Sequence, residues 1–145
     1  ARPLLETMGN RIFLTGPLGS GHAMKALNNY VSAAGLAAVC EALIVGRAFG
    51  LEPAAMTEVL NASSGKNNTS EVKVKQFMLS GAFNSGFSAG LMVKDVAIAA
   101  QLADAMGVKA PFAHDCVAVW QEMVAGLGAG ADHTEFFRFS EAGRR

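Results

Sequence analysis

Apolar positions recur with a helical period over most of the chain from residue 20 onward. Between Ser20 and Phe49 no proline interrupts the pattern, and Gly50 follows as a stop. Ser20 is expected to be the N-cap, since serine commonly accepts the first free backbone N–H groups of a helix. One helix over this stretch would be about 45 Å long at roughly 1.5 Å per residue. We therefore expect a long helix that serves as a scaffold.

Prolines, glycines and polar caps divide the rest of the chain into shorter helices. Pro53 is typical of a first helical turn. Thr69 or Ser70 is expected to cap the next helix, and Asp132 with Glu135 matches a capping box. The expected helices cover residues 53–63, 69–79, about 89–106, 111–124 and a short stretch after 132. The pattern predicts an all-α helical bundle built on the long helix, with no internal strand pair.

The first 18 residues show a different pattern. The run "LLETMG" is typical of the last turn of a helix with a glycine stop, and "RIFLT", residues 11–15, is a short β-like stretch. A single strand is unstable without a partner. We therefore expect this strand to be the remnant of a sheet outside the chain. Residues 1–18 would be the tail end of an absent N-terminal domain, and residues 19–145 one helical domain.

Composition restricts the class of protein. A chain of 145 residues builds one core, and its twelve basic and twelve acidic side chains give no net field to attract nucleic acid or an anionic membrane. No signal-peptide pattern and no run of 18 apolar residues is present. Cys40 and Cys116 lie in apolar helical surroundings and are interpreted as reduced core thiols. These features predict a cytoplasmic protein without nucleic-acid or membrane partners.

Candidate chemistry lies at the start of the long helix. Lys25 and Asn29 are four residues apart, so both lie on one helical face. Gly19 and Gly21 remove side chains at the helix entry, where a ligand or a second backbone could approach. A lysine on a partly desolvated face can exchange a proton near neutral pH, and a carboxamide can hold a substrate oxygen. On spacing alone, a solvated lysine and simple turn glycines remain the alternative.

Two motifs resemble those of a known family. Gly19, Gly21, Lys25 and Asn29 form the pattern Gly-x-Gly-x-x-x-Lys-x-x-x-Asn, which resembles the catalytic signature of the β-hydroxyacid dehydrogenases. This family includes 3-hydroxyisobutyrate dehydrogenase and relatives of 6-phosphogluconate dehydrogenase. A second segment, "FSAGLMVKDVAIAAQLA" at residues 87–103, is similar to the family's Phe-x-x-x-Leu-x-x-Lys-Asp segment. The resemblance extends over essentially the whole chain.

The resemblance implies roles for five residues. Lys25 would be the general acid/base that exchanges a proton with the substrate hydroxyl group. Asn29 would bind the reacting oxygen or orient Lys25, and Gly21 would let the substrate approach closely. Phe87 and Lys94 would contact the bound cofactor, NAD or NADP. The implied substrate is a small β-hydroxyacid such as 3-hydroxyisobutyrate, or its semialdehyde, and no metal is implied.

The resemblance also implies a fold and partners. The helical domain would be the C-terminal catalytic and dimerisation domain of a hydride-transferring oxidoreductase, like that of 6-phosphogluconate dehydrogenase, in a homodimer or homotetramer. Most of the cofactor would bind to an N-terminal Rossmann domain, whose Gly-x-Gly-x-x-Gly turn after a strand is not found in this sequence. The isolated domain should therefore be inactive. A non-catalytic oligomerisation module and a reductase of another class of substrate, such as imines, remain alternatives.

Other polar residues carry weaker expectations. Asp95, next to Lys94, is expected to orient neighbouring groups, and an ion pair or a helix cap is an equal alternative. The loop "SSGKNN", residues 63–68, could touch a substrate carboxylate through Ser64, Lys66 or Asn67, but its composition is that of an ordinary loop. His114 and His133 show no ligand spacing for a metal, and His22 is at a variable position of the family motif.

Overall fold

The computed structural model describes residues 2–143. Residue 1 of the expected tail segment and residues 144–145 of the expected helical domain lie outside the described residues. The helical elements are α1 (Arg2–Glu6), α2 (Ser20–Phe49), α3 (Pro53–Ala62), the π-helix η1 (Thr69–Leu79), α4 (Ala89–Ala105), α5 (Pro111–Leu127), the 3₁₀ turn η2 (His133–Glu135) and α6 (Phe136–Ala142). Within residues 2–143 no strand forms, and Ser88 and Asp132 make one isolated bridge. The expected all-α class is confirmed.

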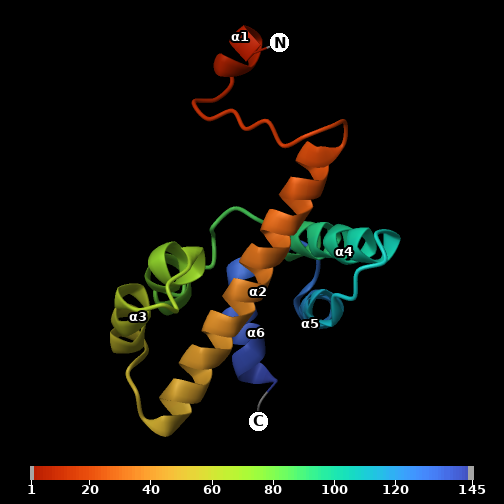
Figure 1. Cartoon of the computed structure of the whole chain (residues 1–145). Helices are drawn as coiled ribbons and strands as arrows, with labels where there is room; N and C mark the ends of the chain where they lie inside the picture. The colour runs from red at the N-terminus through yellow and green to blue at the C-terminus, as the bar shows by residue number, and fades with distance from the viewer. Residues whose placement is uncertain (1, 144–145) are drawn as a thin grey trace.

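The long helix α2 is the central element of the fold. It has the bounds that the sequence predicts, and it contacts α3, η1, α4, α5 and α6. Figure 1 shows α3 on one side of α2 and α4 with α5 on the other. By length and composition α2 could also cross a membrane, a property that apolar core helices share. Here one face of α2 supplies much of the core.

The expected N-cap of α2 is wrong. Gly19 occupies the cap position with a left-handed φ of 92°, and no side chain caps the helix. The hydroxyl of Ser20 lies instead 2.8 Å from that of Thr15. Glycine adopts this backbone conformation without the steric cost that a side chain would add. The two glycines that precede Lys25 therefore help to start helix α2 and also leave open space near Lys25.

The expected strand at residues 11–15 does not form in this chain. The segment runs away from the bundle as irregular backbone, and its apolar side chains Phe13 and Leu14 are exposed. A strand needs a hydrogen-bonded partner, and residues 2–143 provide none for this segment. The short helix expected before it is present as α1.

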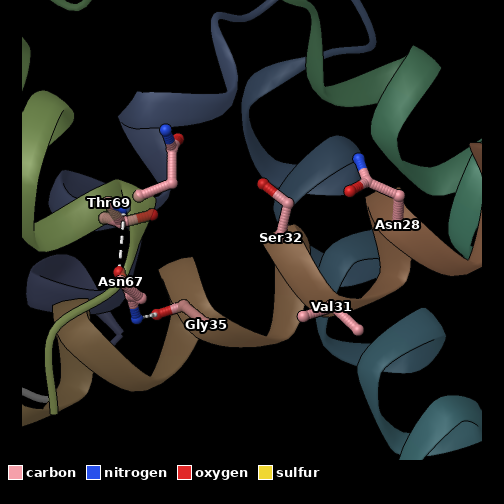
Figure 2. A pocket seen from close by; sticks show the side chains of 7 residues that line it. Asn28, Val31, Ser32, Gly35, Asn67 and Thr69 are labelled. Carbon is pink, nitrogen blue, oxygen red and sulfur yellow. Dashed lines mark hydrogen bonds between the residues drawn. The ribbon is translucent and has the colours of Figure 1, made fainter. Parts of the chain in front are cut away.

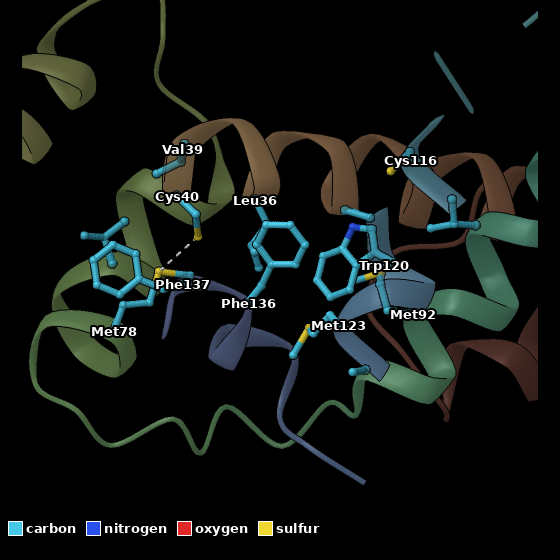
Figure 3. Close-up of a cluster of buried hydrophobic side chains, with 14 of the residues drawn as sticks. Leu36, Val39, Cys40, Met78, Met92, Cys116, Trp120, Met123, Phe136 and Phe137 are labelled. Atoms are coloured by element: carbon cyan, nitrogen blue, oxygen red, sulfur yellow. Dashed lines mark hydrogen bonds between the residues drawn. The ribbon is translucent and has the colours of Figure 1, made fainter. Parts of the chain in front are cut away.

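The core lies between α2 and the C-terminal half of the chain. Trp120 of α5 packs against Phe136 of α6, with ring centroids 4.7 Å apart, and Leu36 of α2 is fully buried beside them (Figure 3). Cys40 and Cys116 are both buried and free, as expected. Burial raises the pKa of the Cys116 thiol to about 11, so the thiol stays protonated at neutral pH.

The start of α4 is joined tightly to the loop before η2. The backbone N–H groups of Ala89 and Gly90 donate to the carbonyl oxygens of Ala131 and Ala129, at 2.8 and 3.0 Å. A Cβ atom on Gly90 would lie 2.9 Å from both the carbonyl oxygen and the Cβ of Ala129. Because one obstacle is backbone, no side-chain rotation can relieve that contact. Glycine is therefore required where the two segments meet.

The capping box predicted for Asp132 and Glu135 is confirmed, and it belongs to a larger network. The Asp132 carboxylate accepts hydrogen bonds from the Ser85 hydroxyl and the Gly86 N–H, both at 2.9 Å. Burial works to raise the pKa of Asp132, but the hydrogen bonds, from Thr134 first and then from Gly86 and Ser85, lower it. The carboxylate therefore stays ionised and joins the residues before α4 to η2.

His133 is buried in the same network as a neutral group. Its Nδ1 lies 3.0 Å from the carbonyl oxygen of Phe87, so Nδ1 carries the proton and donates it. Burial lowers the pKa of His133, and the positive charge of Lys73 lowers it further. The 3.6 Å approach to Asp132 is therefore not a charged pair at neutral pH.

Replacing Gly90 tests the contact at the start of α4. We expect Gly90→Ala to lower the free energy of unfolding by about 1–3 kcal/mol, the usual cost of overpacking. Gly130→Ala is the matched control, because a Cβ there meets nothing within 4 Å, and it should change stability by less than about 0.5 kcal/mol. Denaturant unfolding of both variants measures the difference. Equal stability of the two variants would contradict the steric argument.

Acid titration tests the neutral state of His133. The pKa of His133 is lowered in the fold, so below about pH 6.5 the unfolded chain binds the proton more readily than the folded chain. The free energy of unfolding therefore decreases as the pH decreases. The loss is at most about 1.4 kcal/mol per pH unit. Asp132, whose pKa is also lowered, adds a further loss below about pH 3.8. The free energy of unfolding of the wild type should decline from pH 6.5 to 5 more steeply than that of His133→Asn, and identical profiles would refute the assignment.

Candidate active site

The residues of the two sequence motifs meet where α2 and α4 cross. Lys25 and Asn29 come from the first turns of α2, and Lys94 and Asp95 come from α4. The amide Nδ2 of Asn29 donates to Asp95 Oδ2 at 2.6 Å, and Lys25 Nζ lies 3.8 Å from the same oxygen. Lys94 Nζ lies 3.6 Å from the other oxygen, Oδ1. The structure thus joins into one cluster residues that are 66 positions apart in sequence.

Asp95 is the buried centre of this cluster. The residue is only 4% exposed, whereas the side chains of Lys25 and Lys94 are 66% and 59% exposed. A buried carboxylate needs hydrogen bonds and neighbouring positive charge, which Asn29 and the two lysines supply. The ammonium groups remain accessible from solvent and can meet a ligand on the side away from Asp95. The ion pairs are the alternative role expected for Asp95, and its orienting role stays a prediction.

A cavity of about 490 Å³ opens beside the cluster. Asn29 and Ser32 of α2 form one wall, Lys73 and Gln76 of η1 form another, and Phe87 lies on the border. Because Asn29 both borders the cavity and bonds to Asp95, a ligand in the cavity would lie next to the cluster. Phe87 therefore shares a cavity with Asn29, and its contact with the cofactor stays a prediction.

His133 packs against Phe87 in the cavity wall. The two rings meet edge to face with centroids 5.5 Å apart, and the backbone N–H of His133 donates to the carbonyl oxygen of Phe87 at 2.8 Å. His133 also lines the cavity. The hydrogen bonds of the Asp132 network consequently set the position of a cavity-lining aromatic ring.

Gly21 lies outside this cavity, one helical turn before Lys25. A Cβ atom at this position would have only the Thr15 hydroxyl within 4 Å, at 3.9 Å. The described part of the chain therefore leaves open space around Gly21, and its predicted role in substrate access stays a prediction.

The loop at residues 63–68 is attached to α2 by Asn67 (Figure 2). Its Nδ2 donates to the carbonyl oxygen of Gly35 at 3.3 Å, and its Oδ1 accepts from the N–H groups of Thr69 and Ser70 at 2.8 and 3.0 Å. The expectation that Thr69 or Ser70 caps η1 is therefore wrong, because the carboxamide of Asn67 takes that place. In the same loop, Lys66 pairs with Glu71 at 2.8 Å.

Asn67 also borders a second, smaller hollow, which Ser32 shares with the main cavity. Figure 2 shows Asn28 and Ser32 on α2 facing this hollow, with Asn67 attached to the helix at Gly35. The amide of Asn67 is already engaged with backbone groups, which indicates a structural role for this member of the loop.

Sequence reasoning missed Lys73 as a residue of the cavity. Lys73 and Lys75 are two apart, so a helix directs them to different faces. Lys75 pairs with Glu58 at the surface, whereas Lys73 is half buried in the cavity wall. The sequence carries no signal that separates the two lysines, because both flank Val74.

Known proteins show similarity over this domain. Residues 19–140 match the family described as "NAD-binding of NADP-dependent 3-hydroxyisobutyrate dehydrogenase". The 2-(hydroxymethyl)glutarate dehydrogenase of Eubacterium barkeri is 37% identical over 98 residues, which are 68% of this chain and 33% of that protein. The 3-hydroxyisobutyrate dehydrogenase of Pseudomonas aeruginosa is 39% identical over 116 residues, which are 76% of this chain and 38% of that protein.

A solved structure shows the same arrangement of helices. The 3-hydroxyisobutyrate dehydrogenase of Mycobacterium tuberculosis with L-serine superposes with a TM-score of 0.85 at 27% identity, covering 96% of this chain and 50% of that chain. The chain thus spans about half the length of this relative and about a third of the two dehydrogenases compared by sequence. With a family match over most of its length, the chain belongs to the 3-hydroxyisobutyrate dehydrogenase family, in its NAD-binding helical domain.

Proposed function

We propose that this chain is the helical, catalytic half of an NAD(P)-dependent oxidoreductase that acts on a small β-hydroxyacid or its semialdehyde, with Lys25 as the general acid/base. The observation that carries the proposal is the joining of Lys25, Asn29 and Lys94 around the buried Asp95. The family match over residues 19–140 and the relatives that act on hydroxyacids support it.

In this proposal Lys25 moves a proton rather than anchoring a helix. Its Nζ is 3.8 Å from Asp95 Oδ2, too far for a hydrogen bond but close enough for electrostatic attraction. Asn29 makes the short hydrogen bond to that oxygen instead. Lys25 therefore keeps its amino group free for a substrate hydroxyl: the neutral amine takes a proton from it in oxidation, and the ammonium form returns one in reduction.

Asn29 and Asp95 act as positioning residues in this proposal. The carboxylate can only accept hydrogen bonds, so the NH₂ group of Asn29 faces Asp95 and the carboxamide is held in one orientation. The side chain borders the cavity, which places its remaining polar atoms next to a bound substrate. Gly21 contributes open space one turn before Lys25.

Lys94 and Phe87 fit a nicotinamide cofactor. Lys94 has an exposed ammonium group that pairs with Asp95 and remains accessible to a ligand. Phe87 has a half-buried ring that lines the cavity. A positive charge suits a phosphate-bearing ligand and an aromatic ring suits a planar one. When bound, NAD or NADP supplies the hydride acceptor or donor. In this proposal most of the cofactor lies on a second, Rossmann-type domain, so this half alone is inactive.

Self-association would accompany catalysis rather than replace it. Met24, Leu27 and Val31 are exposed on α2, on the side away from the Lys25 and Asn29 face. These apolar side chains support a homodimer or homotetramer that buries the N-terminal half of α2. They equally support the alternative of a non-catalytic oligomerisation module, so oligomeric state alone does not decide the function, whereas the effect of removing Lys25 does.

Replacing Lys25 tests the acid/base role in the complete enzyme that contains this chain. We expect Lys25→Met to lower kcat for oxidation of a β-hydroxyacid by about 10²- to 10⁴-fold, the usual contribution of a positioned acid/base. The Kd of the nicotinamide cofactor should stay within about threefold of the wild type, because Lys25 does not contact the cofactor in this proposal. Steady-state kinetics and cofactor titration measure the two quantities.

The matched control is Lys109→Met, which removes an exposed lysine in the turn between α4 and α5. This variant should retain wild-type kcat. If Lys25→Met kept wild-type activity, the helical half would have an assembly role and the proposed chemistry would be wrong.

A further inference from the structure

Lys73 has an unusual environment for a lysine. It lies on η1 with a half-buried side chain, and it lines the cavity that Asn29 and Phe87 border. It takes part in none of the ion pairs found within residues 2–143, whereas its neighbour Lys75 pairs with Glu58. A cation that is withdrawn from water without a paired anion costs stability. Such a group is more readily explained by a ligand than by the fold.

Attraction to anions in the fold offsets only part of the cost of burying Lys73. Burial lowers its pKa, and attraction to Asp132 and Cys40 opposes that effect. The Asp132 carboxylate is already engaged by Ser85, Gly86 and Thr134, and the Cys40 thiol is protonated because burial raises its pKa. The remaining titratable neighbour, His133, is neutral. Lys73 therefore brings to the cavity wall a positive charge that the fold compensates only in part.

Lys73 and Asn29 border the same cavity from different helices. Asn29 on α2 borders the cavity on the side of Lys25 and Asp95, and Lys73 borders it from η1 with Gln76. At about 490 Å³ the cavity has room for a small acid that spans both walls. Lys25 does not line the cavity, but Asn29 does, so a substrate that reaches from Lys25 into the cavity extends toward η1.

We propose that Lys73 binds a second anionic group at the far end of the substrate, so that the preferred substrate is a β-hydroxyacid with two carboxylates. This inference rests on the proposed function, because it assigns the substrate class of the same site. Lys73 contacts substrate but moves no proton, so its contribution is to selectivity between diacids and monoacids. Gln76, a neutral donor on the same wall, can add a hydrogen bond to the same carboxylate.

A matched pair of acids tests the proposal in the complete enzyme. The probes are 2-(hydroxymethyl)glutarate and 2-(hydroxymethyl)pentanoate, which differ in a terminal carboxylate against a methyl group. Their Kd values are measured by calorimetry with reduced cofactor present, so that no turnover occurs. We expect Lys73→Gln to lower the preference for the diacid by about 10- to 100-fold, the range for a hydrogen bond to a charged group.

Two further variants serve as controls. Lys73→Arg keeps the positive charge and should retain the preference for the diacid to within a few-fold. Lys75→Gln removes a lysine from the same helix outside the cavity and should leave the preference unchanged. Because the preference is a ratio measured within one variant, partial unfolding affects both acids equally and cancels.

Other outcomes overturn the proposal. An unchanged preference in Lys73→Gln would exclude a contact with the second carboxylate, and a weaker Kd for the cofactor with that preference unchanged would show that the lysine serves a cofactor phosphate. The acid/base role of Lys25 is tested separately by turnover, whereas this test uses binding alone. A wild type that binds the diacid through Lys73 but shows no Lys25-dependent turnover would refute the proposed function and keep this inference.

Discussion

The burial of the Asp95 carboxylate between α2 and α4 is the constraint on which the site depends. A carboxylate with 4% exposure must be compensated by hydrogen bonds and positive charge. Asn29 provides the hydrogen bond across the two helices, and Lys25 and Lys94 provide the charge, each near a different carboxylate oxygen. Removing a partner from a buried charge typically costs about 3–5 kcal/mol. The requirement therefore fixes how α2 and α4 meet as well as where the lysines lie.

The site combines a rigid wall with accessible cations. Phe87 is held by His133, by the Asp132 network and by the close approach of Gly90 to Ala129. These are backbone contacts and short hydrogen bonds within a well-packed part of the fold. The lysines that face the cavity or border the cluster are instead long side chains with exposed or half-exposed amines. A rigid wall can select the shape of a ligand, while the cations adjust to its charge.

Polar groups in this domain divide between structural and ligand-directed roles according to how completely they are satisfied. The carboxamide of Asn67 bonds to backbone at both ends, so it attaches the loop at residues 63–68 to α2. Asp132 is likewise saturated by its neighbours. Lys25 and Lys73 lack such saturation, and this difference is what separates the proposed functional residues from the equally polar loop beside them.

Local periodicity determined most of the helices and one face of the site. The bounds of α2, the start of α3 at Pro53 and the capping box at Asp132 follow from interactions within a few residues, which a sequence displays directly. The shared face of Lys25 and Asn29 follows in the same way from helical geometry. Only the tertiary structure could decide which groups compete for a cap, and at η1 it selected Asn67. In the tertiary structure residues 11–15 also have no strand partner within residues 2–143, Asp95 lies at the centre of the cluster, and Lys73 lines the cavity. The sequence could not determine the last two features, because burial and charge pairing arise where helices distant in sequence cross.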